Sequence, residues 1–122
     1  MAERLTEQVI GLAITVHRHT GPGMLETVYE RCLCLELHRA GVRFERQVPV
    51  PVMYRGEDVG TGFRADLVVD GTVIVEVKAV AAILPVHEVQ LRTYLRMSGL
   101  RVGLLLNFNE TRLVDGLRRF VV

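Results

Sequence analysis

GFRADLVVDGTVIVEVKAV, at residues 62–80, is the stretch that decides the fold. Large and β-branched apolar residues occupy positions 67–69, 73–75 and 77, on either side of Asp70-Gly71, a dipeptide typical of tight hairpin turns. The pattern therefore predicts two antiparallel strands. In the second strand Glu76 and Lys78 share the more polar face, because side-chain direction alternates along a strand.

The length of the turn decides whether Asp66 joins that face. A bare two-residue loop would place Asp66 on the face opposite to Glu76. A three-residue loop, Val69-Asp70-Gly71 with its glycine left-handed in a bulge, pairs Val68 with Thr72 and puts both carboxylates on one face as diagonal neighbours. Such neighbours lie roughly 7–8 Å apart at the backbone, from where both can reach one cation. We therefore predict the bulged turn.

Two carboxylates and a lysine on one face can support metal-assisted hydrolysis of a phosphodiester. Mg²⁺ takes oxygen ligands and keeps waters that phosphate oxygens can replace, so Asp66, Glu76 and the Val77 carbonyl are candidate ligands. Lys78 would steer or deprotonate the attacking water. A Glu-x-Lys pair on the solvated side of a half-buried strand is also common. On these three residues alone that second interpretation is favoured.

Length and composition fit one domain over residues 1–122. The chain is 49% hydrophobic and 24% charged, which suits a globular protein with its own core and argues against disorder. Its net charge of +1 makes no strong electrostatic case for nucleic acid. Lys78 is the only lysine among 15 basic residues, and it stands where chemistry needs a titratable ammonium.

Cysteine usage and hydropathy bear on location. Cys32 and Cys34 are two apart on a predicted helix and face different directions, so we expect neither a disulfide nor a metal pair. They suit a reducing compartment, and we expect a cytoplasmic protein. No stretch approaches the length of a membrane span, so we expect no membrane partner.

The remaining elements follow from hydrophobic period and from Gly and Pro. Pro49 and Pro51 confine their strand to a sheet edge or a bulge. A strand, a helix and another strand in succession predict a parallel pairing. We expect the final pair Val121-Val122 to pack back on the sheet. The pattern predicts helices at 5–19, 24–40 and 85–97, and strands at 44–54, 59–69 and 101–108.

Glu26 lies in the first turn of the second helix. A carboxylate there suits the helix macrodipole and can close a capping box. It can also be a third acidic group brought to a metal. Without further information the capping role is favoured.

The helix at 85–97 carries two polar rows. Gln90 and Tyr94 lie one turn apart, and Arg92 and Arg96 form a second, basic row. Gln90 and Tyr94 can bind a phosphate or hold Lys78, or they can form a polar seam between helix and sheet. Spacing leaves both alternatives open.

Taken together, the motifs resemble the PD-(D/E)XK nuclease superfamily, and more closely its small GxxExxY protein family. The likeness covers nearly the whole chain in the right order, and no core position departs from the pattern. Its motifs are GPGMLETVYE at 21–30, R-x-D at 64–66, EVKAV at 76–80, PVHEVQLRTYL at 85–95, GLLLNFN at 103–109 and LVDGLRRFV near the end.

This resemblance implies an α/β fold with a restriction-endonuclease-like αβββαβ core, a mixed central sheet flanked by helices. By motif, Asp66 and Glu76 would be metal ligands and Lys78 the catalytic lysine. Glu26 resembles the extra acidic residue of resolvase-like and exonuclease-like branches, and would be a catalytic residue and a further ligand. Gln90 and Tyr94 resemble a Q-x-x-x-Y motif that assists the lysine and the substrate phosphate. Candidate nucleic-acid contacts are Arg64, Arg92 and Arg96.

The function implied is a Mg²⁺-dependent nuclease, with Mn²⁺ as a substitute, that hydrolyses DNA and leaves a 5′-phosphate. One alternative is a non-catalytic module that binds nucleic acid or protein and retains the fold, which the near-zero net charge favours. Another is a subunit that needs a homodimer or an accessory protein to build its DNA cleft, because a domain this small covers few base pairs.

Overall fold

The computed structural model describes residues 2–122 as two helices, three strands, a helix and two further strands, in chain order. The αβββαβ core implied by the sequence is confirmed within this order. The elements are α1 (Ala2–Thr20), α2 (Glu26–Arg39), β1 (Phe44–Tyr54), β2 (Glu57–Val69), β3 (Val73–Lys78), α3 (Pro85–Ser98), β4 (Val102–Asn107), the 3₁₀ turn η1 (Leu113–Gly116) and β5 (Leu117–Val121).

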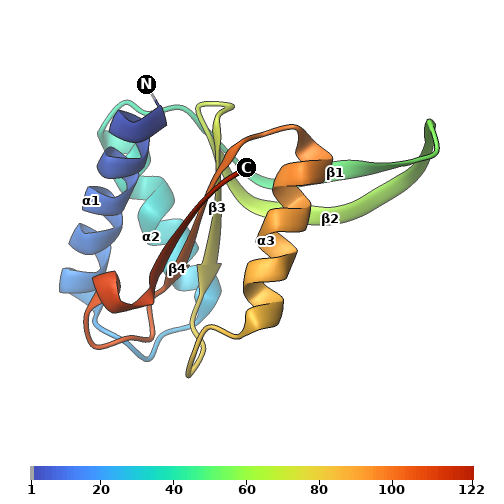
Figure 1. Ribbon diagram of the computed structural model, residues 1–122. Helices are drawn as coiled ribbons and strands as arrows, with labels where there is room; N and C mark the ends of the chain where they lie inside the picture. The colour runs from blue at the N-terminus through green and yellow to red at the C-terminus, as the bar shows by residue number, and fades with distance from the viewer. Residues whose placement is uncertain (1) are drawn as a thin grey trace.

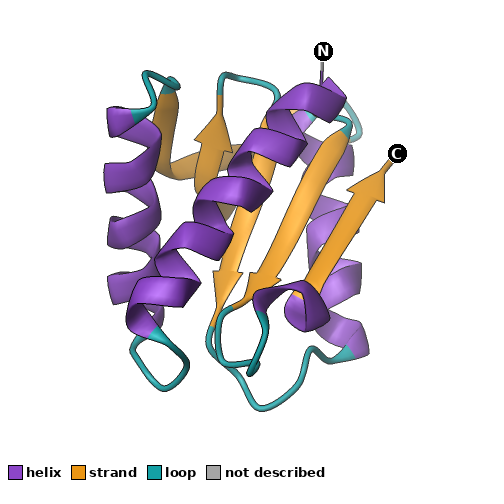
Figure 2. Cartoon of the chain, turned by 90° about the vertical axis from the view of Figure 1, so that its left-hand side faces the viewer, coloured by secondary structure: helices purple, strands orange, loops and turns teal. Residues whose placement is uncertain are grey.

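The five strands form one mixed sheet in the order β1-β2-β3-β4-β5. β3 and β4 run parallel, as predicted, and the other neighbours are antiparallel. A parallel pair needs a crossover, and α3 supplies it. Helices α1 and α2 therefore cover one face of the sheet and α3 covers the other (Figures 1 and 2).

Each face of the sheet has its own core. The side chains of β3 alternate between the two cores. Val73, Val75 and Val77 face α1 and α2, whereas Ile74 faces α3. The first core also holds Val9, Ala13, Val16, Tyr29, Leu33, Leu37, Leu67, Val69, Leu104, Leu106 and Phe108. The second holds Ala65, Val68, Leu91, Leu95, Leu105 and Phe120.

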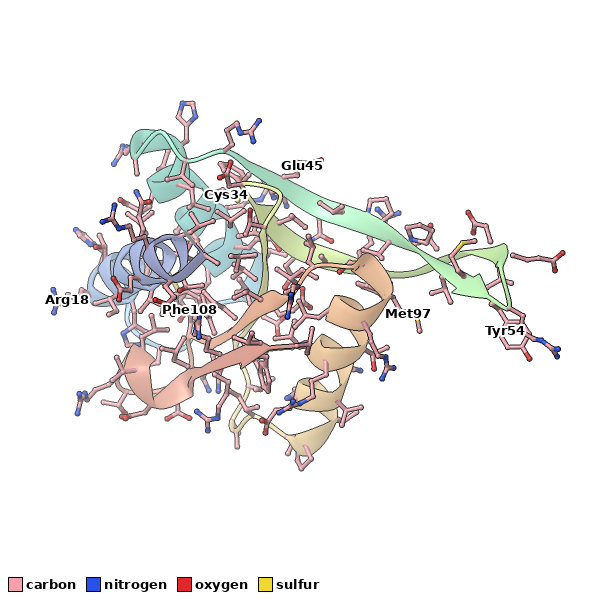
Figure 3. The ribbon with its side chains drawn as sticks, turned by 45° about the horizontal axis from the view of Figure 1, so that its top comes forward. Arg18, Cys34, Glu45, Tyr54, Met97 and Phe108 are labelled. Atoms are coloured by element: carbon pink, nitrogen blue, oxygen red, sulfur yellow. The ribbon has the colours of Figure 1, made fainter. Side chains whose placement is uncertain are left out.

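The distal halves of β1 and β2 leave the body of the molecule as a two-stranded arm (Figure 1). Tyr54 lies at its far end (Figure 3). β1 is an edge strand, and its register with β2 shifts on either side of Pro51. The prediction from Pro49 and Pro51 is thus confirmed in both respects, since the strand is at an edge and irregular.

The hairpin turn has three residues, but not the three predicted. Val69 pairs with Val73, so the loop is Asp70-Gly71-Thr72 rather than one starting at Val69. Both Asp70 and Gly71 have positive φ, and the Thr72 N–H donates to the Val69 carbonyl at 2.9 Å. The correction shifts the pairing by two positions, so that Asp66 and Glu76 come just beyond the last pair, Leu67 and Val75, each next along its own strand, instead of lying as diagonal neighbours.

The end of the chain also differs from expectation. Leu117–Val121 forms a strand that pairs with β4, which the sequence did not predict. Phe120 is the residue that enters the core, whereas Val121 and Val122 are 56% and 44% exposed. The expected packing of Val121-Val122 was therefore wrong, because strand alternation turns Val121, next to the buried Phe120, outward, and Val122 lies beyond the end of the strand.

Within residues 2–122, no helix combines the length and apolar character that crossing a bilayer requires.

Candidate active site

β2 and β3 separate at Asp66 and Glu76. Their backbone pairing ends at Leu67 and Val75, after which β2 continues with β1 and β3 continues with β4. At this fork, hydrogen bonds from the backbone to side chains take the place of the backbone hydrogen bonds between the two strands. The Asp66 N–H donates to Glu76 Oε2 at 2.8 Å, and the Val77 N–H donates to Asp66 Oδ2 at 2.9 Å. The two carboxylates are therefore held by each other's strand.

This pair lies in surroundings that disfavour negative charge. Glu76 is only 6% exposed, and burial, followed by repulsion from Asp66, raises its pKa from 4.5 to about 8. Burial likewise raises the pKa of Asp66, and the nearby Glu30 carboxylate adds to it. A cation placed between the two groups would relieve both effects.

Lys78 ends β3 on the same face as Glu76. Its charge acts to lower the pKa values of both Asp66 and Glu76, so the ammonium lies close enough to influence the pair. The buried Asn107 side chain holds the chain beyond Lys78. Its Oδ1 accepts from the Val80 N–H at 3.0 Å, and its Nδ2 donates to the Val80 carbonyl at 2.9 Å.

Glu26 reaches the same end of β3 from the start of α2. Its Oε2 accepts from the Ala79 N–H at 3.3 Å, next to Lys78. Tyr29 holds the preceding loop, because its hydroxyl donates to the Gly21 carbonyl at 2.6 Å and accepts from the Met24 N–H at 3.0 Å. The tyrosine ring is buried and stacks on Phe108, whose place between α1 and the sheet is visible in Figure 3. The tyrosine thus fixes where α2, and Glu26 with it, begins.

Glu30 is a further acidic residue near the fork, and the sequence motifs did not identify it as a site residue. It lies one turn after Glu26 and is 4% exposed. It is bound to Arg46 and Gln47 of β1, and Gln47 in turn binds Asp66. A signal was available in the sequence, because the positions one and two turns after Glu30 on the same face of the helix, Leu33, Cys34 and Leu37, are apolar. Asn107 was also missed, as one polar residue inside an apolar run.

Helix α3 covers the face of β3 that Ile74 shares with Glu76 and Lys78, and it brings Tyr94 towards the fork. Its ring stacks on Phe63 of β2, with centroids 3.9 Å apart. Burial and the charges of Glu76 and Asp66 raise its pKa, which keeps the hydroxyl protonated as a hydrogen-bond donor. Gln90 lies one turn earlier on the helix and is exposed.

The three predicted arginine contacts do not converge. Arg64 extends from β2, with Nη1 donating to the Gln47 carbonyl at 3.4 Å, beside the fork. Arg92 lies with its guanidinium carbon 4.7 Å from the centroid of the Phe120 ring, towards β5. Helical periodicity places Arg96 on the flank of Arg92, away from Tyr94. Arg64 is therefore the arginine that adjoins the acidic pair.

Asp66 and Glu76 suit a magnesium ion by their chemistry. Across residues 2–122 no three His, Cys, Asp or Glu side chains converge on one point, and Glu26 is hydrogen-bonded to the Ala79 backbone. Mg²⁺ does not need three, because it commonly binds one or two carboxylates and completes its shell with water and phosphate. Two mutually repelling carboxylates in a buried site fit that requirement.

Two hollows lie on the surface, and neither is lined by Asp66, Glu76 or Lys78. One of about 370 Å³ is lined by Met24, Leu25, Glu26, Thr27 and Ala79, at the end of β3. A larger one, of about 770 Å³, lies at the far end of the hairpin near Asp70 and Arg43. We assign function to the β3 end because the carboxylates and the lysine are there.

Neither the curated proteins nor the solved structures provide a match to the chain. A family model described as the PD-(D/E)XK nuclease superfamily matches residues 3–120, almost the whole chain. The match agrees with the strand order, the fork in the sheet and the D…E-x-K residues beside it, and the chain belongs to the PD-(D/E)XK nuclease superfamily.

Proposed function

We propose that the protein is a Mg²⁺-dependent nuclease that hydrolyses DNA phosphodiester bonds and leaves a 5′-phosphate. The observation that supports this most is the fork itself. Buried Glu76 and half-buried Asp66, whose carboxylates each bond to the other's strand, stand beside the chain's only lysine. Buried like charges are costly unless a cation compensates them, so a site of this kind favours metal binding.

Each residue has a distinct role in this proposal. Asp66, Glu76 and the Val77 carbonyl would hold Mg²⁺ or Mn²⁺, with Glu26 as a further ligand. When bound, the ion supplies positive charge to the phosphate and lowers the pKa of water. Lys78 orients the attacking water. As a neutral amine it would accept the proton of that water, and as an ammonium it would offset negative charge on the phosphate oxygens.

The substrate is held by groups on both sides of the acidic pair. Tyr94 donates its hydroxyl hydrogen to a phosphate oxygen, and Gln90 binds the next phosphate or Lys78. Arg64 contacts the backbone of the nucleic acid beside the fork, whereas Arg92 and Arg96 would contact only a longer segment that passes over α3. The stacking of Tyr94 on Phe63 and the contact of Arg64 with the Gln47 carbonyl support the roles proposed for Tyr94 and Arg64.

Three variants test the proposal. Asp66→Asn should weaken Mn²⁺ binding and abolish cleavage, whereas Lys78→Met should keep Mn²⁺ binding and lower the cleavage rate by about 100-fold or more. Asp70→Asn is the matched control, because Asp70 lies on the same hairpin but is exposed and paired with Arg43 at 3.0 Å. The measurements are calorimetric titration with Mn²⁺ and cleavage of duplex, single-stranded and branched DNA. Full cleavage by both Asp66→Asn and Lys78→Met would place the active site elsewhere.

A non-catalytic module that binds nucleic acid or protein is the second candidate, and the net charge of +1 favours it. Calorimetry separates the two. Wild-type protein that binds neither Mg²⁺ nor Mn²⁺ would support the binding module.

We further propose that residues 1–122 act as one cytoplasmic domain of the GxxExxY type, in which Gly23, Glu26 and Tyr29 are the motif residues. The free thiols of Cys32 and Cys34 suit a reducing compartment. A homodimer or an accessory protein would extend the short DNA cleft. Sedimentation with and without DNA tests that extension.

A further inference from the structure

Glu30 is a buried acid with both oxygens engaged. Its Oε2 accepts from Arg46 Nε at 2.9 Å and Nη2 at 2.8 Å, and its Oε1 accepts from Gln47 Nε2 at 2.9 Å. The partners differ in exposure, since the Glu30 side chain is 5% exposed and that of Arg46 is 35% exposed. A buried ion pair of this kind is weak evidence for stability, because desolvation offsets much of the attraction. Stability alone therefore does not account for the buried Glu30 carboxylate.

The backbone of β1 is distorted so that Glu30 can have both partners. Arg46 and Gln47 are consecutive strand residues, whose side chains ordinarily point to opposite faces. Gln47 has φ of 50°, in the left-handed region that residues other than glycine seldom adopt. The register of β1 with β2 includes Arg46 and Val48 but omits Gln47. This left-handed residue turns both side chains towards α2.

The distorted segment of β1 also contacts the acidic pair through Gln47. Gln47 Nε2, fixed by Glu30, also donates to Asp66 Oδ1 at 3.4 Å. Asp66 uses its other oxygen to accept from the Val77 N–H. Gln47 therefore determines the direction of the oxygen that the strands leave free. Strained backbone of this sort concentrates at functional sites, where the surrounding structure holds it in place.

We propose that Glu30 and Gln47 are positioning residues for the metal site, with Glu30 fixing the Gln47 amide and the amide orienting Asp66 Oδ1 towards the cation. Neither residue touches the metal or the substrate. This inference rests on the proposed function, since it assumes that Asp66 is a ligand. Outer residues that orient a ligand are typically worth 10- to 100-fold in metal affinity.

Gln47→Met tests the inference, because it keeps the length of the side chain and removes the amide. Glu30→Gln is a second variant, since an amide in place of the carboxylate offers one acceptor oxygen for the three N–H donors of Arg46 and Gln47. Glu45→Gln is the matched control, from an exposed position on the same strand (Figure 3). For each protein the Kd for Mn²⁺ is measured by calorimetry, the cleavage rate is followed against Mn²⁺ concentration, and the melting temperature is taken in chelator.

The expected result is a Kd raised about 10-fold or more in Gln47→Met and Glu30→Gln, with the cleavage rate at saturating Mn²⁺ retained and Glu45→Gln unchanged. A Kd within about twofold of wild type in both variants, or a loss of maximal rate in step with the melting temperature, overturns the positioning role while the nuclease proposal stands. Wild-type protein that binds no Mn²⁺ overturns the nuclease proposal, and this inference with it.

Discussion

Glu76 shows how a single residue can couple the site to stability. Its side chain is buried, it faces a second carboxylate, and the bond from the Asp66 N–H does not offset these two effects. The folded protein therefore holds the Glu76 proton more tightly than the unfolded chain does. A group with a raised folded pKa contributes stability that is complete below its unfolded pKa and is lost as the pH rises through its folded pKa.

In chelating buffer, we expect the wild-type protein to lose stability relative to Glu76→Gln as the pH rises from about 4.5 to about 8. Asp66 contributes with the same sign, because its pKa is also raised. The denaturation midpoint in urea, followed against pH, measures the difference. Glu45→Gln is the exposed control and should track the wild type. Mg²⁺ added at about pH 8 should raise the midpoint of the wild type more than that of Glu76→Gln, and parallel curves for these two proteins in chelator would contradict the expectation.

At the scale of elements, the sequence predicted most of the fold because its proline and glycine residues mark turns and strand edges clearly. Pro49 and Pro51 marked the edge strand, and Asp70-Gly71 marked the hairpin. The sequence did not determine the register. Loops at 69–71 and at 70–72 both have three residues, and the alternation of side chains does not distinguish between them. β5 was missed because only Phe120 in it is buried, which leaves too little alternation to detect.

The candidate site was only half predictable, for a related reason. Asp66, Glu76 and Lys78 lie on one hairpin, where period-two alternation relates them directly. The contacts of Glu30 depend on a left-handed Gln47 in the middle of β1, and such a conformation interrupts the period on which sequence inference rests. Asn107 binds Val80 between the ends of the parallel strands β3 and β4, which the crossover helix separates in sequence, and local spacing cannot show that contact.

Gly103 permits the close packing of α3 on β4. A Cβ at this position would lie 3.0 Å from Leu91 Cδ1 and 3.2 Å from Leu95 Cδ1, the two buried residues of that helix. We expect Gly103→Ala to lower the free energy of unfolding by about 1–3 kcal/mol. Gly11→Ala is the opposite control, because Gly11 is an exposed position within α1 with no atom near the added Cβ.

Gly11→Ala should raise the free energy of unfolding by about 0.5–1 kcal/mol, since alanine favours the helix. Chemical denaturation of both variants measures the two signs. An equal change in both would mean that the packing of Gly103 has no special role.

At the scale of the whole molecule, the site lies where the sheet divides. The arm of β1 and β2 departs on one side of the fork, and α3 covers the adjoining face (Figure 1). The outer part of the arm carries Arg55, Glu57 and Asp58, so it adds no net positive charge there. A nucleic acid that reaches Asp66 would therefore meet few cations, with Lys78 at the acidic pair and Arg64 beside it.

This charge distribution predicts a shallow dependence of DNA binding on salt. Each phosphate contact contributes close to one to the slope of log K against log salt concentration, so Arg64→Gln should reduce that slope by about one. Arg92→Gln should leave it nearly unchanged for a short duplex, because the Arg92 guanidinium lies over Phe120 on the far flank of α3. Binding in Ca²⁺ or with Lys78→Met, at several salt concentrations, measures the slope without cleavage. A drop of about one for Arg92→Gln as well would mean that the DNA crosses α3 and contacts Arg92 in addition to Arg64, whereas no drop for Arg64→Gln would remove the nucleic acid from the fork.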